Sequence, residues 1–262
     1  MKAVDQNRRA WDAAVDKQDI WTRPVDAEEI ARARLGDWEI VLTPHKAVPK
    51  EWFPAKLQGV KTLCLASGGG QQGPILAAAG ADVTVFDNSP KQLAQDEFVA
   101  KREKLHLQTV QGDMADLSMF GNESFDLIVH PVSNCFCEKI QPVWQEAYRV
   151  LKYQGVLLSG FINPIAFLID PELERQGIVQ IKGQLPYSGV PNPTDDEPLI
   201  EFGHSLEEQI NGQIQAGFAI VGFYEDIWGD RQKSRHADFK EEYILDQHFP
   251  AFMASKAIKL RL

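Results

Sequence analysis

The sequence predicts an α/β fold with a mostly parallel sheet, and three observations lead to this prediction. Short apolar runs recur along the middle of the chain, stretches of helical length separate them, and the first run ends in glycines. An apolar run without alternation is typical of a strand that is buried on both faces, as the strands of a parallel sheet are. Strands that alternate with helices form such a sheet through right-handed crossovers.

The predicted strands follow from the apolar runs. Those in the middle of the chain cover residues 60–66, 83–86, 105–110, 125–129 and 156–161. The end of the chain carries two more runs, at 216–223 and 252–260, without an apolar pattern of helical length between them. The sequence therefore predicts that the chain closes with two strands rather than with a further strand and helix pair.

Helix signals lie between these strands. Ser89 is followed by Pro90 and, three residues after the serine, by Gln92, which is a pattern typical of a helix start. The stretch 205–208, Ser-Leu-Glu-Glu, fits a capping box and predicts another helix start. One apolar face at helical spacing is formed by Trp144, Ala147, Tyr148 and Leu151.

The two remaining parts of the chain interrupt this alternation. Residues 1–55 contain four tryptophans among short segments separated by prolines, and we expect an N-terminal helical cap that packs on the main body. Residues 56–262 form the predicted core. Within the core, residues 164–203 contain six prolines and an acidic run, which predicts an inserted lid.

Composition and charge exclude several classes of protein. The net charge of −10 at pH 7 makes nucleic acid a poor partner, because phosphate backbones are anionic. The three cysteines do not form metal-ligand spacing or a disulfide framework, so no metal site is predicted. No apolar segment has the length of a signal peptide or a membrane span, so we expect a cytoplasmic protein without a membrane partner. Nothing in the sequence indicates an oligomeric state.

A glycine loop follows the first strand. Gly68, Gly70 and Gly73 fit the spacing of a dinucleotide-binding fingerprint, and Asp87 stands at the end of the second strand, where a ribose-binding acid is expected. Such a loop brings the backbone close to a ligand. The alternative is a tight strand-to-helix turn that binds nothing.

A second carboxylate favours the binding loop over the turn that binds nothing. Asp113 follows the third strand, so Asp87 and Asp113 end neighbouring strands on the same edge of the sheet. One carboxylate can accept hydrogen bonds from both ribose hydroxyls, and the other can accept one from an adenine amine. The alternatives are a helix N-cap for Asp87 and a turn residue for Asp113.

With these motifs in order, the sequence resembles the class I S-adenosylmethionine-dependent methyltransferases of the small-molecule type. The resemblance covers about residues 60–161 and implies a Rossmann-like, seven-stranded, mostly parallel sheet with helices on both faces and an antiparallel C-terminal hairpin. Its motifs are the glycine loop at 66–70, Val85 to Ser89, Gly112 to Met114, Ser124 to His130, and Arg149 to Leu158. The cofactor-binding residues that it implies are Ala66, Ser67, Gly68, Gly69, Gly70, Asp87, Asn88, Gly112, Asp113, Met114 and His130.

By this resemblance, Ser67 to Gly70 line the methionine end of the cofactor, Asp87 binds the ribose, and Asp113 with Met114 holds the adenine. The sequence departs from the family pattern at three positions. Cys64 and Ala66 stand where an acid and the first glycine are usual, and Gln154 replaces a glycine. Ala66 is a mild change if its φ angle is negative.

The chemistry expected is transfer of the methyl group of S-adenosylmethionine to a small-molecule acceptor by in-line displacement, which chiefly requires alignment and exclusion of water. His130 is the candidate general base, since histidine titrates near neutrality; the alternative is a ring that only packs against or hydrogen-bonds the cofactor. We expect residues 1–55 and 164–203 to close over the cofactor and form the acceptor pocket. The other functions left open are a nicotinamide-dependent oxidoreductase, which would need a second mononucleotide-binding half, and a non-catalytic S-adenosylmethionine-binding protein.

Overall fold

A seven-stranded sheet organises the chain. The computed structural model describes residues 3–189, 197–226 and 249–260. The strand order across the sheet is β3-β2-β1-β4-β5-β9-β8. The bounds of these strands are β1 Lys61–Leu65, β2 Asp82–Asp87, β3 Leu107–Gln111, β4 Phe125–His130, β5 Leu151–Ile162, β8 Phe218–Asp226 and β9 Phe252–Lys259.

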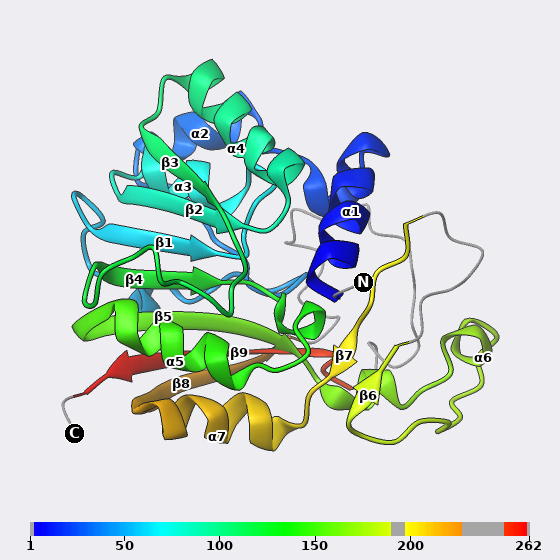
Figure 1. The fold of residues 1–262 in the computed structure, drawn as a ribbon. Helices are drawn as coiled ribbons and strands as arrows, with labels where there is room; N and C mark the ends of the chain where they lie inside the picture. The colour runs from blue at the N-terminus through cyan, green and yellow to red at the C-terminus, as the bar shows by residue number, and fades with distance from the viewer. Residues whose placement is uncertain (1–2, 190–196, 227–248, 261–262) are drawn as a thin grey trace.

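The first five strands run parallel, and β9 lies antiparallel to both of its neighbours, β5 and β8 (Figure 1). The expected antiparallel pair at the end of the chain is therefore present, with β8 on the outer edge of the sheet. The order reverses at β1, because the chain runs outward to β3 and then returns to β4 on the other side of β1. Ligands of open α/β sheets bind beside such a reversal, at the carboxyl ends of the strands.

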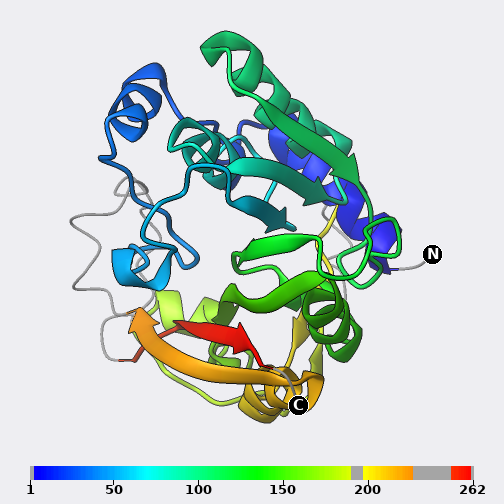
Figure 2. The ribbon, with the colours of Figure 1, turned by 90° about the vertical axis from the view of Figure 1, so that its left-hand side faces the viewer.

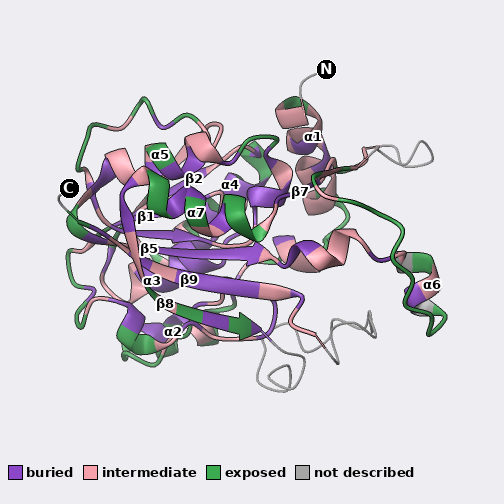
Figure 3. Ribbon diagram, turned by 90° about the horizontal axis from the view of Figure 1, so that it is seen from below, coloured by how far each residue is buried: buried purple, intermediate pink, exposed green. Residues whose placement is uncertain are grey.

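Helices cover both faces of the sheet. The helices α2, α3 and α4 contribute to one apolar core, and α5 contributes to the core on the opposite face, where α7 packs on it (Figure 2). The central strands are buried almost throughout, as Figure 3 shows. The helix bounds are α1 Ala3–Asp16, α2 Ala27–Arg34, α3 Gln72–Ala78, α4 Pro90–Glu103, α5 Gln141–Val150, α6 Pro171–Arg175 and α7 Leu206–Ala216, and the short 3₁₀ helices are η1 Ile20–Thr22, η2 Lys50–Trp52, η3 Asn134–Phe136 and η4 Pro164–Phe167.

Local sequence signals account for the helix starts. The Ser89 side chain accepts a hydrogen bond from the Gln92 backbone N–H at 3.1 Å, with Pro90 in the first turn, as the sequence predicts. Ser205 forms the predicted capping box at the start of α7. Leu151 corrects the predicted face of α5, because it begins β5 instead of continuing the helix.

The described part of the segment predicted as a lid has little regular structure. It contains η4, α6 and a two-stranded sheet formed by β6 Tyr187–Ser188 and β7 Phe202–Gly203. In Figure 1, α6 lies far to the side of the main sheet, beyond the carboxyl ends of the parallel strands. The stretch between β8 and β9, for which the sequence predicts no helix, falls mostly outside the described residues. Among the described helices, none has the length and apolar character that a membrane crossing requires.

Candidate functional site

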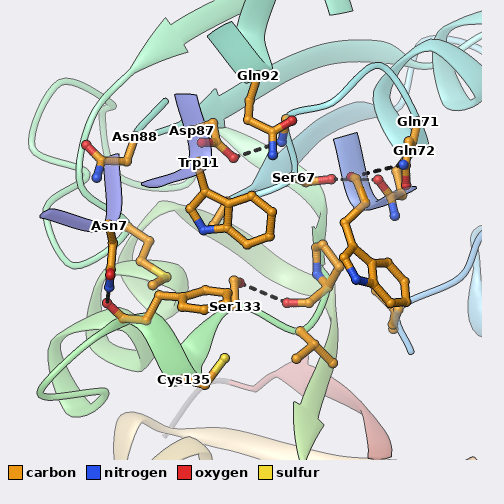
Figure 4. A pocket seen from close by; sticks show the side chains of 18 of the residues that line it. Asn7, Trp11, Ser67, Gln71, Gln72, Asp87, Asn88, Gln92, Ser133 and Cys135 are labelled. Carbon is orange, nitrogen blue, oxygen red and sulfur yellow. Dashed lines mark hydrogen bonds between the residues drawn. The ribbon is translucent and has the colours of Figure 1, made fainter. Parts of the chain in front are cut away.

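A pocket of about 400 Å³ opens at the carboxyl ends of the parallel strands, beside the reversal of strand order. This volume lies in the range typical of small-molecule sites. Figure 4 shows Trp11 extending across the pocket between Asp87 and Ser133. Of the residues that the sequence predicts to bind a cofactor, those that line this pocket are Ala66, Ser67, Gly68, Asp87, Asn88, Gly112, Asp113 and Met114.

Asp87, the last residue of β2, fixes the shape of one wall. Its Oδ2 accepts a hydrogen bond from the Gly68 backbone N–H at 2.9 Å, and its Oδ1 accepts one from the Ser89 N–H at 2.9 Å. Burial raises the pKa of this carboxyl, although the backbone hydrogen bonds oppose the rise. Ser89, not Asp87, is the N-cap of α4, so the helix-cap alternative for Asp87 is wrong. The two oxygens together can still accept a hydrogen bond from a ligand hydroxyl.

The carboxylate of Asp96 holds the glycine loop from the side that faces the protein interior. Asp96 of α4 is fully buried, and its Oδ2 accepts hydrogen bonds from Gly69 N–H at 3.0 Å and Gly70 N–H at 3.1 Å. Neither glycine is among the described residues that line the pocket. A Cβ at Gly70 would lie 2.8 Å from Cβ of Pro24, so the glycines allow close packing inside the protein. Their amides therefore point to Asp96 and away from a ligand.

Asp113, which follows β3, is both a turn residue and a pocket residue. Its Oδ1 accepts a hydrogen bond from the Ala115 N–H at 3.0 Å, which makes it a turn residue, and it also lines the pocket. Gly112 is required by packing, since a Cβ there would lie 2.3 Å from the ring of Phe86. Asp113 and Met114 are thus presented to the pocket by a tight turn.

The two departures in the first motif have different consequences. Cys64 is fully buried in the core, and burial raises the pKa of its thiol, so it is a packing residue. Ala66 lines the pocket but has a φ angle of +48°, in the left-handed region. The negative φ that would make this substitution mild is therefore absent, and the strain is about 1–2 kcal/mol.

The N-terminal helix α1 covers one side of the pocket. The Trp11 ring packs edge-on against Phe136, with centroids 5.3 Å apart. The Ser89 hydroxyl donates to Asp12 at 2.6 Å, and the Asn88 amide donates to the Val4 carbonyl at 2.8 Å. The ring contact holds α1 against η3, and the two hydrogen bonds hold it against the start of α4.

His130 lies behind the pocket. It is fully buried and absent from the described lining residues; its Nδ1 lies 2.9 Å from the Leu65 carbonyl oxygen and its Nε2 lies 2.8 Å from Oδ1 of Asn134. Burial lowers its pKa, because a charged imidazolium is poorly solvated there. Among the described residues, the ring meets the pocket only through Ser133, a lining residue whose Oγ lies 3.3 Å from Nδ1, so the role of His130 as a general base stays a prediction.

Charge distinguishes this pocket from a dinucleotide site. The charged side chains among its described lining residues are Asp87, Asp113 and Glu201, and that part of the lining has no lysine, arginine or histidine. With the loop amides bonded to carboxylates, the described lining offers little to neutralise a pyrophosphate. It suits a ligand with positive charge.

Comparison with known proteins agrees with this geometry. Residues 63–159 match the family described as "Methyltransferase domain". An uncharacterized methyltransferase of Bacillus subtilis, YbaJ, is 50% identical over 265 residues, which cover 98% of each chain. The chain belongs to the class I S-adenosylmethionine-dependent methyltransferases. This methyltransferase uses S-adenosylmethionine as cofactor, and the oxidoreductase alternative is wrong.

More distant relatives bear on the fold of the methyltransferase. A solved S-adenosylmethionine-dependent methyltransferase from Mesorhizobium loti has a TM-score of 0.62 at 20% identity, covering 80% of this chain and 95% of that chain. The sterol methyltransferase-like protein 3 of Botryococcus braunii is 27% identical over 183 residues, which cover 64% of this chain and 44% of the relative. The sheet predicted from the sequence therefore has the arrangement found in solved methyltransferases of this kind.

Sequence reasoning missed four residues around the site of this methyltransferase: Asn7, Gln92, Asp96 and Glu201. Gln92 is buried and lines the pocket, and its Oε1 has no hydrogen-bond partner among the described residues. Its place five residues after Asp87 was a usable signal, because the first turn of a helix after a strand faces the ligand. Glu201 lay in a segment without periodicity, so only the fold could place it.

Proposed function

We propose that this chain transfers the methyl group of S-adenosylmethionine to a small, largely apolar acceptor bound in the same pocket. The observation that supports this proposal best is the charge of the pocket, whose described lining carries three carboxylates and no basic side chain. Such a lining suits a sulfonium and an ammonium group, and it disfavours acceptors that carry phosphate or carboxylate.

The residues present fit the cofactor. In this proposal Asp87 accepts hydrogen bonds from the ribose hydroxyls, Asp113 and Met114 hold the adenine, and Ser67 with Gly68 lines the methionine portion. The orphaned Oε1 of Gln92 is a further acceptor for a hydroxyl or amine of the ligand. When bound, S-adenosylmethionine supplies a methyl group that is already strongly electrophilic.

The remaining lining residues would orient the acceptor and exclude water. We assign acceptor selection to the N-terminal cap, residues 1–55, and to the lid, residues 164–203. The cap contributes Asn7, Trp11 and Trp21 to the lining, and the described part of the lid contributes Leu199 and Glu201. Aromatic walls favour a flat or apolar molecule. The name of the sterol methyltransferase-like relative is in line with an apolar acceptor.

The test follows radioactive methyl groups from labelled S-adenosylmethionine into a cell extract separated into small molecules and macromolecules. We expect label in the small-molecule fraction. Label confined to protein or nucleic acid would overturn the acceptor class. Binding of S-adenosylhomocysteine without any transfer in either fraction would favour the non-catalytic alternative.

A further inference from the structure

Of the three carboxylates in the described pocket lining, Glu201 alone does not lie at the carboxyl end of a strand of the parallel sheet. It lies next to Phe202 of β7, in the last part of the lid, shortly before α7 begins. Its carboxylate makes no hydrogen bond or ion pair with any described residue. Burial raises its pKa, and no neighbouring cation opposes the rise.

The backbone on either side of Glu201 is firmly held. Asn7 of α1 donates to the Ile200 carbonyl at 2.9 Å and accepts from the Ile200 N–H at 2.7 Å. The Glu201 carbonyl accepts from the Gly189 N–H at 2.8 Å, and Phe202 pairs with Ser188. The ring of His204 bonds the Cys137 carbonyl at 2.8 Å. The backbone that carries the Glu201 side chain is therefore held in place before any ligand arrives.

Glu201 is partly buried, and the cavity that it lines has several apolar side chains. Leu199, Phe136 and Phe252 line the same cavity. Cys135 is also close, because the charge of Glu201 adds to burial in raising the pKa of its thiol. In Figure 4, Asn7 and Cys135 lie on the opposite side of the pocket from Gln71 and Gln72, which follow the glycine loop. Because Asn7 bonds the neighbouring Ile200 and the charge of Glu201 acts on Cys135, Glu201 lies toward this side of the pocket, away from the loop assigned to the methionine end of the cofactor.

A partly buried carboxylate without a partner loses part of its hydration, and that cost is offset when a ligand supplies a hydrogen-bond donor or a cation. The cofactor has its own carboxylates at Asp87 and Asp113. We propose that Glu201 binds the acceptor and selects an apolar molecule that carries an amino group. This assignment rests on the proposed function, since it names the class of acceptor for the same pocket.

The experiment compares amines with carboxylic acids of equal length in the presence of saturating S-adenosylhomocysteine. The probes are phenethylamine against 3-phenylpropionate, tryptamine against indole-3-propionate, and hexylamine against heptanoate, with binding measured by calorimetry. We expect wild-type protein to bind at least one amine about tenfold or more tightly than its acid, because the carboxylate attracts one and repels the other. Glu201→Gln should reduce that preference to about threefold or less.

Two controls distinguish a specific loss of the amine preference from a general effect of charge, of cofactor binding or of folding. Glu207→Gln changes an exposed glutamate at the start of α7 and should keep the full preference. The affinity for S-adenosylhomocysteine should be the same in wild type and Glu201→Gln. The unfolding temperature of Glu201→Gln should be equal to that of wild type or higher. Absence of any amine preference in wild type, or its persistence in Glu201→Gln, would overturn the assignment.

A weaker affinity for S-adenosylhomocysteine in Glu201→Gln would place Glu201 at the cofactor instead and would also overturn it. Failure of the wild-type protein to bind S-adenosylhomocysteine at all would refute the proposed function itself. The two proposals can therefore fail separately.

Discussion

The carboxylate of Asp87 accepts a hydrogen bond from the backbone N–H of Gly68 at 2.9 Å, so the end of β2 holds the loop that follows β1. One side chain thereby has two tasks, because it shapes the loop and faces the pocket. The pocket is consequently formed by contacts between neighbouring strand ends before a cofactor binds.

Replacement of Asp87 by alanine should weaken binding of S-adenosylhomocysteine by about ten- to a hundredfold, or roughly 1.5–3 kcal/mol, through loss of charge-assisted hydrogen bonds to the ribose. The same change leaves the Gly68 and Ser89 amides without their acceptor, so the free energy of unfolding should also fall. Calorimetric titration and urea denaturation measure the two effects. Asp82→Ala, at the exposed start of the same strand, is the matched control. An unchanged dissociation constant would exclude Asp87 from the cofactor site.

Asp96 should make the stability of the protein depend on pH. Burial raises its pKa well above the usual value, with the nearby Asp87 carboxylate contributing, so the folded protein holds this proton more tightly than the unfolded chain does. Stability should therefore fall as pH rises from the unfolded pKa through the folded one. Asp96→Asn should remove that part of the fall and be more stable than wild type at neutral pH.

Urea denaturation across the acidic to neutral range tests this expectation, with Asp82→Asn as control. Asp96→Ala should behave differently from Asp96→Asn, because alanine leaves the Gly69 and Gly70 amides without an acceptor and should cost about 1–3 kcal/mol for each buried amide. If the free energy of unfolding changed with pH in the same way in wild type and Asp96→Asn, the buried carboxylate would not be the source of the pH dependence.

Gln154 occupies a position where the family usually has glycine, and its φ angle is +63°. A left-handed conformation strains a residue that carries a Cβ. Gln154→Gly should raise the free energy of unfolding by roughly 0.5–1 kcal/mol, after subtraction of the extra entropy of glycine in the unfolded chain. Gln154→Ala keeps the strain and should leave the melting temperature nearly unchanged. Equal melting temperatures for all three proteins would argue against strain at this turn.

Asn7 connects α1 to two other segments. Its side chain bonds the Phe136 carbonyl at 3.1 Å and both backbone groups of Ile200, next to Glu201. Asn7→Ala should lower the free energy of unfolding by roughly 2–3 kcal/mol, because these buried groups lose their partner. It should also reduce the amine preference assigned to Glu201. Gln6→Ala, which removes bonds to Glu197 and Pro198 on the same helix, is the control and should preserve that preference.

Much of the fold could be predicted because its signals are local. Apolar runs identify the buried strands, and Ser89 and Ser205 identify the starts of α4 and α7 from a few neighbouring residues. Asp87 and Asp113 could be placed at one sheet edge because parallel strands end on the same side. The small error at Leu151 arose because one apolar residue satisfies both the helical spacing and the start of a buried strand.

The sequence by itself determined the parallel sheet, the positions of the two aspartates and the resemblance to a methyltransferase, since each depends on spacing along the chain. Only the tertiary structure decided which side chains reach the pocket. It buried His130 between Leu65 and Asn134, turned the Gly69 and Gly70 amides toward Asp96, and brought Glu201 into the cavity. The physical reason is that burial and hydrogen-bond partners depend on segments far apart in sequence, which local patterns do not encode.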